Sequence, residues 1–149
     1  MIAGPSVTIL EPETEEDFER YYELRWRILR APWHQPRGSE RDALDAQAIH
    51  LMACLADRVP VGVGRLHLVA PGEARIRYMA VAPAQRGLGI GRRLLAALEG
   101  RARTAGVRRI RLEAREAAVE FYRRHGYRAA GPGHVLYGRI RHRRMDKTL

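Results

Sequence analysis

The hydrophobic pattern of the chain changes from that of strands to that of a helix between Val81 and Ile90. Three strand-like runs separated by turn residues precede the change, at residues 47–56, 61–69 and 75–81. Their apolar or alternating character predicts an antiparallel meander. After Pro83 the apolar residues recur at helical spacing, which predicts a helix over residues 87–104. A strand that leads into a helix and then another strand predicts a βαβ crossover.

The other segments predict further helices and strands, which are delimited by turn and cap residues. We expect a strand at 7–10, a helix at 14–30, a short helical turn to Ala46 capped by Ser39, a strand at 107–113, a helix at 115–125, a strand start at 127–130 broken by the glycine-proline segment 131–133, and a last strand within 135–145. This order predicts an α/β domain with a mixed sheet, antiparallel first. The length of 149 residues predicts one domain over 1–149.

Composition excludes several classes of protein. The lone Cys54 excludes an intramolecular disulfide and a multi-cysteine zinc site, and it favours a reducing compartment. No run approaches 18 apolar residues, and the first residues lack the basic start of a secretory signal. We therefore expect a cytoplasmic protein that needs no membrane and no metal.

The net charge of +10 comes almost wholly from arginine. Such a charge is compatible with nucleic-acid binding, with attraction of a polyanionic small molecule, or with an arginine-rich genome. The stretches 20–41 and 86–144 are both rich in arginine, and the chain has no single basic tail. Neither a helix-turn-helix pattern nor an aromatic strand motif for base stacking is present, so nucleic acid is not the expected partner.

Three glycines at alternate positions, Gly87, Gly89 and Gly91, lie at the predicted start of the helix. A helix N-terminus offers unpaired N–H groups to an anion, and glycine lets the anion approach the backbone, so the loop predicts a phosphate site. The segment has no lysine for a P-loop. The fingerprint of dinucleotide-binding folds also fits poorly, because Leu94 stands where its third glycine belongs.

Two motifs resemble those of the GNAT acetyltransferase superfamily. The first is Arg86-Gly87-Leu88-Gly89-Ile90-Gly91, which is similar to the acyl-CoA signature R-x-x-G-x-G. The second is Ala118-Val119-Glu120-Phe121-Tyr122-Arg123-Arg124-His125-Gly126-Tyr127, which resembles the downstream A-x-x-x-Y-x-x-x-G-[FY] segment. The similarity extends over about residues 6–146. It implies a small bacterial single-domain enzyme with a largely antiparallel central sheet and helices on both faces.

The resemblance also implies the cofactor and its contacts. Acetyl-CoA would lay its pantetheine arm where the strand ending at Val81 splays from the strand at 107–113, and its pyrophosphate on the amides of the glycine loop. The cofactor-binding residues implied in this way are Met79, Ala80, Val81, Arg86, Gly87, Leu88, Gly89, Ile90, Gly91, Arg92 and Tyr122. Arg93 is an alternative to Arg92 as a phosphate contact.

Acyl transfer needs a deprotonated amine and a stabilised thiolate. By the resemblance, Tyr122 would serve the thiolate as a strong hydrogen-bond donor, and its alternative role is that of a core aromatic residue. The candidate bases are Glu40, His50, Glu113 and His142. His50 lies in an apolar run, where a histidine is more often satisfied by its core neighbours, and the glutamates are more often surface or ion-paired groups.

One departure from the family pattern concerns the cofactor, since Arg115 stands where many relatives carry an asparagine. The segments 24–33 and 141–145 would form the acceptor side, with Trp33 and His34 as candidate pocket residues. The expected reaction is acetylation of a primary amine of a small metabolite or a protein. A catalytically silent CoA-binding domain and, less favoured, a basic nucleic-acid-binding module remain as rival functions, and a homodimer is left open.

Overall fold

The computed structural model describes residues 6–149, and its elements follow the predicted order. In chain order they are β1 (Thr8–Leu10), α1 (Glu15–Leu29), the 3-10 turns η1 (Ala31–Trp33) and η2 (Ala43–Gln47), β2 (Ile49–Leu55), η3 (Ala56–Arg58), β3 (Val59–Ala70), β4 (Glu73–Val81), η4 (Pro83–Gln85), α2 (Ile90–Thr104), β5 (Arg109–Arg115), η5 (Glu116–Ala118), α3 (Val119–Arg124), β6 (Arg128–Leu136) and β7 (Ile140–Thr148).

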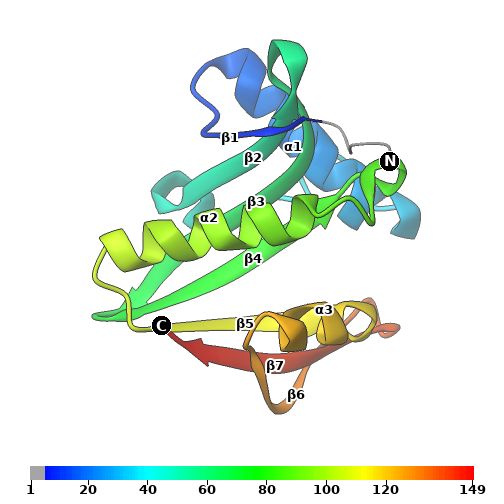
Figure 1. Cartoon of the computed structure of the whole chain (residues 1–149). Coiled ribbons are helices and arrows are strands. Elements are labelled where there is room, and N and C mark those ends of the chain that lie inside the picture. The colour runs from blue at the N-terminus through cyan, green and yellow to red at the C-terminus, as the bar shows by residue number, and fades with distance from the viewer. Residues whose placement is uncertain (1–5) are drawn as a thin grey trace. The chain divides into compact units, whose positions relative to one another are not determined.

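The strands of the described residues form one mixed sheet in the order β1-β2-β3-β4-β5-β7-β6 (Figure 1). The pairs β1–β2, β2–β3, β5–β7 and β6–β7 are antiparallel. β4 and β5 run parallel, from Glu73 opposite Arg109 to Ile76 opposite Leu112. This parallel pair, joined through α2, is the βαβ crossover that the change of hydrophobic period predicted.

The described residues group into two compact units, one with residues up to 67 and 78–98, the other with 68–77 and 99–149. The first holds β1, β2, most of β3, the end of β4 and α1, together with the first turns of α2. The second holds β5, β6, β7, α3 and the hairpin between β3 and β4. The expectation of a single domain over 1–149 stays a prediction, and residues 1–5 lie outside the described part.

Helix α1 begins where the sequence predicts it. The Thr14 hydroxyl accepts a hydrogen bond from the Asp17 amide at 3.0 Å, and the Asp17 carboxylate accepts one from the Thr14 amide in return. This capping box satisfies two of the amides that a helix start leaves unpaired. Asp17 also pairs with Arg58 at 2.8 Å, so the same carboxylate ties the start of α1 to the turn after β2.

The first unit has a helix on each face of its strands (Figure 1). Residues of α1, including Tyr21 and Leu24, pack with Met52 and Val63 on one face. Ile90 of α2 packs with Val61 on the other face. Gly64 lets α2 lie close to β3 further along the helix, since a Cβ there would lie 2.8 Å from both Leu98 Cδ1 and Met79 Sδ.

In the second unit, β5 alternates between buried and more exposed residues. Ile110, Leu112 and Ala114 are buried, and so are Tyr122 of α3 and Met145 of β7. The residues between them on β5 belong to the opposite face of the sheet, because successive side chains of a strand point to opposite sides.

Three local predictions were wrong. Helix α2 starts at Ile90 rather than at residue 87, because Gly87 and Gly89 have left-handed backbones. Asp42, and not Ser39, caps the turn that ends at Gln47. Residues 131–133 do not break the chain: β6 continues to Leu136 across two irregularities in its pairing with β7, and the hairpin turn falls at residues 137–139.

Candidate active site

The glycine loop connects β4 to α2. Gly87 and Gly89 have φ angles of 79° and 81°, in the left-handed region where side chains other than hydrogen are strained. A Cβ at either position would meet no other atom within 4 Å. Glycine is therefore required here by the backbone conformation, and the space beside it is open to a ligand.

Three amides at the start of α2 have no backbone acceptor in the described part of the chain. Arg93 N donates to Gly89 O at 3.1 Å, whereas the amides of Ile90, Gly91 and Arg92 have no backbone acceptor among residues 6–149. Ile90 is buried at 2% exposure and anchors the turn. Free amides at the positive end of a helix dipole, next to an open loop, form a fitting cradle for a phosphate group.

The arginines around this loop have different roles. Arg86 is exposed, and its Nε donates to Val81 O at 3.2 Å. Arg92 is also exposed. Arg93, the alternative phosphate contact, instead donates from Nη1 to Val7 O at 2.8 Å and so binds the segment before β1.

The end of β4 carries the residues expected beside the pantetheine arm. Tyr78 has a φ of 58°, an uncommon conformation for a residue that is not glycine, and it marks a kink in the strand. Beyond it, Ala80 packs on the α1 side and Val81 on the α2 side. Met79 Sδ lies against the Gly64 backbone. Ala80 is thus buried in the core, and Met79 and Val81 are half-buried against it, which leaves the backbone as the main group that can contact a cofactor.

Tyr122 is buried in the second unit at 7% exposure. Its ring packs edge-on against Phe121 and Tyr127, with centroids 5.1 and 5.7 Å away. Burial raises the pKa of the Tyr122 phenol well above its ordinary value. The hydroxyl forms no hydrogen bond with any residue of the described chain, so it is a neutral donor without a protein acceptor.

Glu113 of β5 belongs to a cluster of charged and aromatic groups. It forms an ion pair with Arg75, and its Oε1 accepts from the His134 amide at 2.8 Å and lies 3.1 Å from His134 Nδ1. Burial alone would raise the pKa of Glu113, but the hydrogen bonds from His134 and the charge of Arg75 lower it. Gly133 makes the approach possible, because a Cβ there would lie 2.6 Å from Glu113 Oε1.

His142 of β7 stacks on His134 with ring centroids 3.9 Å apart. Its Nδ1 faces the carbonyl oxygens of His134 and Ile140 at 3.1 and 3.0 Å. Since carbonyls only accept, Nδ1 carries the proton in the neutral ring and Nε2 holds the lone pair. Burial and the neighbouring His134 lower the pKa of His142, so the ring is a neutral base at pH 7.

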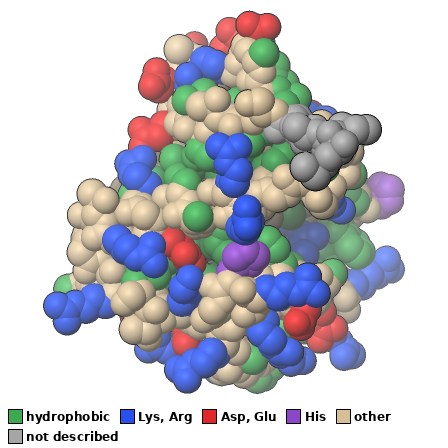
Figure 2. Space-filling model, in the orientation of Figure 1, with side chains coloured by type: hydrophobic (Ala, Val, Ile, Leu, Met, Phe, Trp, Pro, Cys, Tyr) green, Lys and Arg blue, Asp and Glu red, His purple; other side chains and the backbone are tan. Residues whose placement is uncertain are grey.

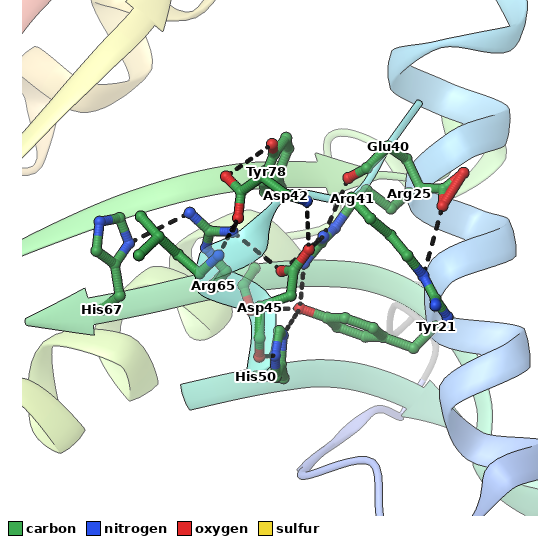
Figure 3. A network of polar contacts seen from close by, with 12 residues as sticks. Tyr21, Arg25, Glu40, Arg41, Asp42, Asp45, His50, Arg65, His67 and Tyr78 are labelled. Carbon is green, nitrogen blue, oxygen red and sulfur yellow. Dashed lines mark hydrogen bonds and ion pairs between the residues drawn. The ribbon is translucent and has the colours of Figure 1, made fainter. Parts of the chain in front are cut away.

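A second cluster lies in the first unit, beneath the segment between α1 and β2 (Figure 3). Arg25 and Arg65 are fully buried, and the Asp45 carboxylate bridges them at 3.0 Å to each. Burial alone would raise the pKa of Asp45, but the charge of Arg25 and the hydrogen bonds lower it. The Tyr78 ring lies 4.2 Å from the Arg25 guanidinium and 4.8 Å from that of Arg65.

His50 and Glu40, two of the candidate bases, belong to this cluster. His50 Nε2 lies 2.7 Å from Asp45 O and Nδ1 lies 2.8 Å from the Tyr21 hydroxyl, so both ring nitrogens are occupied. Burial lowers the pKa of His50 and keeps the ring neutral. Glu40 is 1% exposed and accepts from the Gly38 amide at 2.8 Å.

Residues 18–127 match the family model described as the acetyltransferase (GNAT) family. The chain belongs to this family. It is therefore an acyl-CoA N-acyltransferase, and acetyl-CoA is the co-substrate typical of the group.

Individual GNAT proteins resemble the chain over nearly its whole length. It is 28% identical to the N-acetyltransferase YjcF of Bacillus subtilis over 91% of the chain and 95% of that protein. The structure of an N-acetyltransferase from Lactobacillus plantarum superposes with a TM-score of 0.84 at 26% identity, covering 97% and 99% of the two chains. The fold is also that of an aminoglycoside 6′-N-acetyltransferase in complex with coenzyme A, with a TM-score of 0.78 at 18% identity and 95% and 96% coverage.

The candidate residues of this GNAT chain fall into three groups. The glycine loop, from Arg86 to Arg92, lies in the first unit, and so does the buried cluster around His50. Tyr122, Glu113 and His142 lie in the second unit. His134 was missed by the sequence analysis: it stands eight residues before His142, and only the hairpin turn at 137–139 brings the two rings together.

On the face that Figure 2 shows, the basic side chains of this GNAT chain do not form a single stripe. Lys and Arg side chains are spread there among hydrophobic and acidic ones. Over residues 6–149, no helix has the length and apolar character needed to cross a bilayer. Within the same range, no group of three His, Cys, Asp or Glu side chains is arranged to hold a metal ion.

Proposed function

We propose that the protein transfers an acetyl group from acetyl-CoA to a primary amine of a small metabolite or a protein, by direct attack of the amine nitrogen on the thioester. The observation that carries this proposal is the loop before α2. Its left-handed Gly87 and Gly89 stand next to free amides and open space. GNAT membership supports acetyl-CoA as the group that this loop receives.

In this proposal the amides from Gly87 to Arg92 bind the pyrophosphate, and exposed Arg86 and Arg92 add charge-assisted contacts. The backbone from Met79 to Val81 pairs with the pantetheine arm. The packing of those three side chains supports this assignment, since side-chain contacts position the strand. Val81 O is a backbone group already engaged, by Arg86 Nε. Recognition by backbone also tolerates Arg115 in the position where many relatives carry an asparagine.

The reaction forms a bond between the amine nitrogen and the carbonyl carbon and breaks the bond between that carbon and sulfur. The amine loses one proton, and the departing sulfur finally gains one. We assign to Tyr122 a hydrogen bond to this sulfur. Its pKa, raised by burial, keeps the phenol protonated at neutral pH, and its hydroxyl has no acceptor within residues 6–149.

For the proton of the amine we propose the cluster of Glu113, His134 and His142. His142 holds a lone pair on Nε2, and Glu113 holds the His134 ring that stacks on His142. His50 is the weaker candidate, because it would first have to release Tyr21 or the Asp45 carbonyl.

The test combines cofactor binding with turnover. Calorimetric titration with acetyl-CoA measures binding, and thiol release measures acetyl transfer to a panel of amines. Gly89→Val is expected to weaken acetyl-CoA binding at least tenfold, since a side chain there both strains the backbone and fills the open space. Gly72→Val is the matched control, because Gly72 also has a positive φ of 77° and open surroundings but lies in the turn between β3 and β4.

Unchanged acetyl-CoA affinity in Gly89→Val, or an equal loss of affinity in Gly72→Val, would contradict the assignment of the loop to the cofactor site. Acetyl-CoA binding without thiol release for any amine would instead contradict the proposed transfer reaction.

A further inference from the structure

The second unit contains a cavity of about 410 Å³ on the sheet face that carries Glu113. Its charged lining consists of Arg75, Arg109, Arg111, Glu113, Arg144 and Asp146. The strand register accounts for this gathering. Arg144 lies opposite Glu113, and Asp146 lies opposite Arg111. Directly paired residues of neighbouring strands project to the same side of a sheet, so β5 and β7 present these groups together.

The charges of the lining do not balance. Arg75 pairs with Glu113, and Arg109 pairs with Asp146 at 2.8 Å. Glu73 pairs with both Arg111, at 3.4 Å, and Arg109, at 3.6 Å.

Arg144 donates to Ala130 O at 3.3 Å and has no carboxylate partner within residues 6–149. The lining therefore holds four guanidinium groups and two carboxylates, which leaves it positive at neutral pH.

The cavity also has apolar surface. Val69, which is 47% exposed, contributes its side chain, whereas the side chains of Leu112 and Met145 belong to the buried side of the sheet. A guanidinium group binds carboxylate or phosphate through parallel N–H donors, and short carbon chains favour apolar walls. The lining is therefore complementary to a small organic anion and unfavourable for a compound with several positive charges.

We propose that this cavity binds the acceptor, and that the acceptor is a small primary amine that also bears a carboxylate or phosphate group. The inference rests on the proposed acetyl transfer, because Glu113 is shared: it lines the cavity and holds His134. Glu113 and Arg111 stand two positions apart on β5, about 7 Å along the strand. This distance matches the length of a short zwitterion whose amine lies at Glu113 and whose anionic group lies between Arg111 and Arg144.

Four acceptors with similar short chains test the proposal: O-phosphoethanolamine, β-alanine, ethanolamine and 1,3-diaminopropane. They supply a phosphate, a carboxylate, a neutral group and a second cation. We expect kcat/KM for at least one of the two anionic amines to exceed that for ethanolamine and for 1,3-diaminopropane by about tenfold. The better of the two anionic amines identifies the group that the cavity prefers.

Arg144→Gln should lower the ratio of kcat/KM for the preferred anionic amine to that for ethanolamine by about tenfold, and leave the KM for acetyl-CoA within twofold. Arg143→Gln is the matched control. It removes the same charge from the next residue of β7, which pairs with buried Ala114 and so belongs to the other side of the sheet. The control is expected to keep the ratio of the parent protein.

Equal use of all four amines, or equal effects of Arg144→Gln and Arg143→Gln, would overturn the inference and leave acetyl transfer intact. If none of the four is acetylated although acetyl-CoA binds, calorimetry in the presence of coenzyme A decides. Preferential binding of O-phosphoethanolamine or β-alanine over ethanolamine supports the cavity assignment, and its absence overturns it. A protein that does not bind acetyl-CoA would contradict the proposed function itself.

Discussion

Two tyrosines five residues apart illustrate how neighbouring groups decide the role of a hydroxyl. The Tyr127 hydroxyl donates a hydrogen bond of 2.8 Å to buried Glu99. Glu99 also forms an ion pair with Lys147. The Tyr122 hydroxyl has no such acceptor within the described chain. The first thus helps to hold β6 and β7 to α2, whereas the second makes no such link, which agrees with the role proposed for it above.

This contrast gives a prediction for the pair. Tyr122→Phe is expected to lower kcat at least tenfold, because the departing sulfur loses its donor, with little change in the KM for acetyl-CoA. Tyr127→Phe is expected to keep kcat and lower the free energy of unfolding by about 1 kcal/mol. Steady-state thiol release and urea denaturation measure the two effects. Parental turnover in Tyr122→Phe would show that its ring serves only the core.

At the scale of elements, the segment between α1 and β2 depends on buried charge for its position. It contains only short 3-10 turns over residues 31–47. Asp45 within it bridges Arg25 of α1 and Arg65 of β3, and Arg25 also donates to Glu40 O at 3.1 Å. Removing one partner of such a cluster leaves buried charge uncompensated, which costs more than the cluster contributes as a whole.

Asp45→Asn is therefore expected to lower the free energy of unfolding by about 3 kcal/mol. Glu16→Gln serves as the comparison, because it removes an ion pair with Arg20 in which the Glu16 side chain is 72% exposed. That loss should stay below about 1 kcal/mol. Urea denaturation followed by circular dichroism measures both. Similar losses in the two variants would contradict the structural role of the buried cluster.

At the scale of the whole molecule, the shifted groups predict how stability depends on pH. Burial lowers the pKa values of His50 and His142, so the unfolded chain binds more protons than the folded one as the pH falls below about 6.5. The hydrogen bond from Arg58 lowers the pKa of Asp17 to about 2. The lowered pKa values of the histidines and of Asp17 all make the folded state less stable in acid.

We expect the free energy of unfolding to fall in two stages between pH 7 and pH 2, first through the histidines and then, below about pH 4, through the carboxylates. Asp17→Asn should be less stable than the parent at pH 7, and its free energy of unfolding should fall less in the second stage. Urea denaturation at a series of pH values measures this. A stability that is constant from pH 7 to pH 5 would contradict the histidine contribution.

The order of elements and the place of the glycine loop before α2 could be predicted from the sequence because they depend on neighbouring residues. That this loop binds the cofactor stays a prediction. The helical spacing of Phe18 and Tyr21 and the cap at Thr14 specify α1 within a few residues of chain. Turn residues delimit the strands in the same way. The glycines before Ile90 indicate a phosphate cradle because left-handed backbone and a helix start are local properties.

The tertiary structure decided which polar groups meet. His134 contacts Glu113 from 21 residues away, and Asp45 joins two arginines on different elements. The cavity, in which Arg144 has no carboxylate partner among residues 6–149, likewise depends on the register of β5 and β7. No local pattern encodes such contacts, because they arise only when packing of the apolar faces fixes the strand register and brings distant side chains to one side of the sheet.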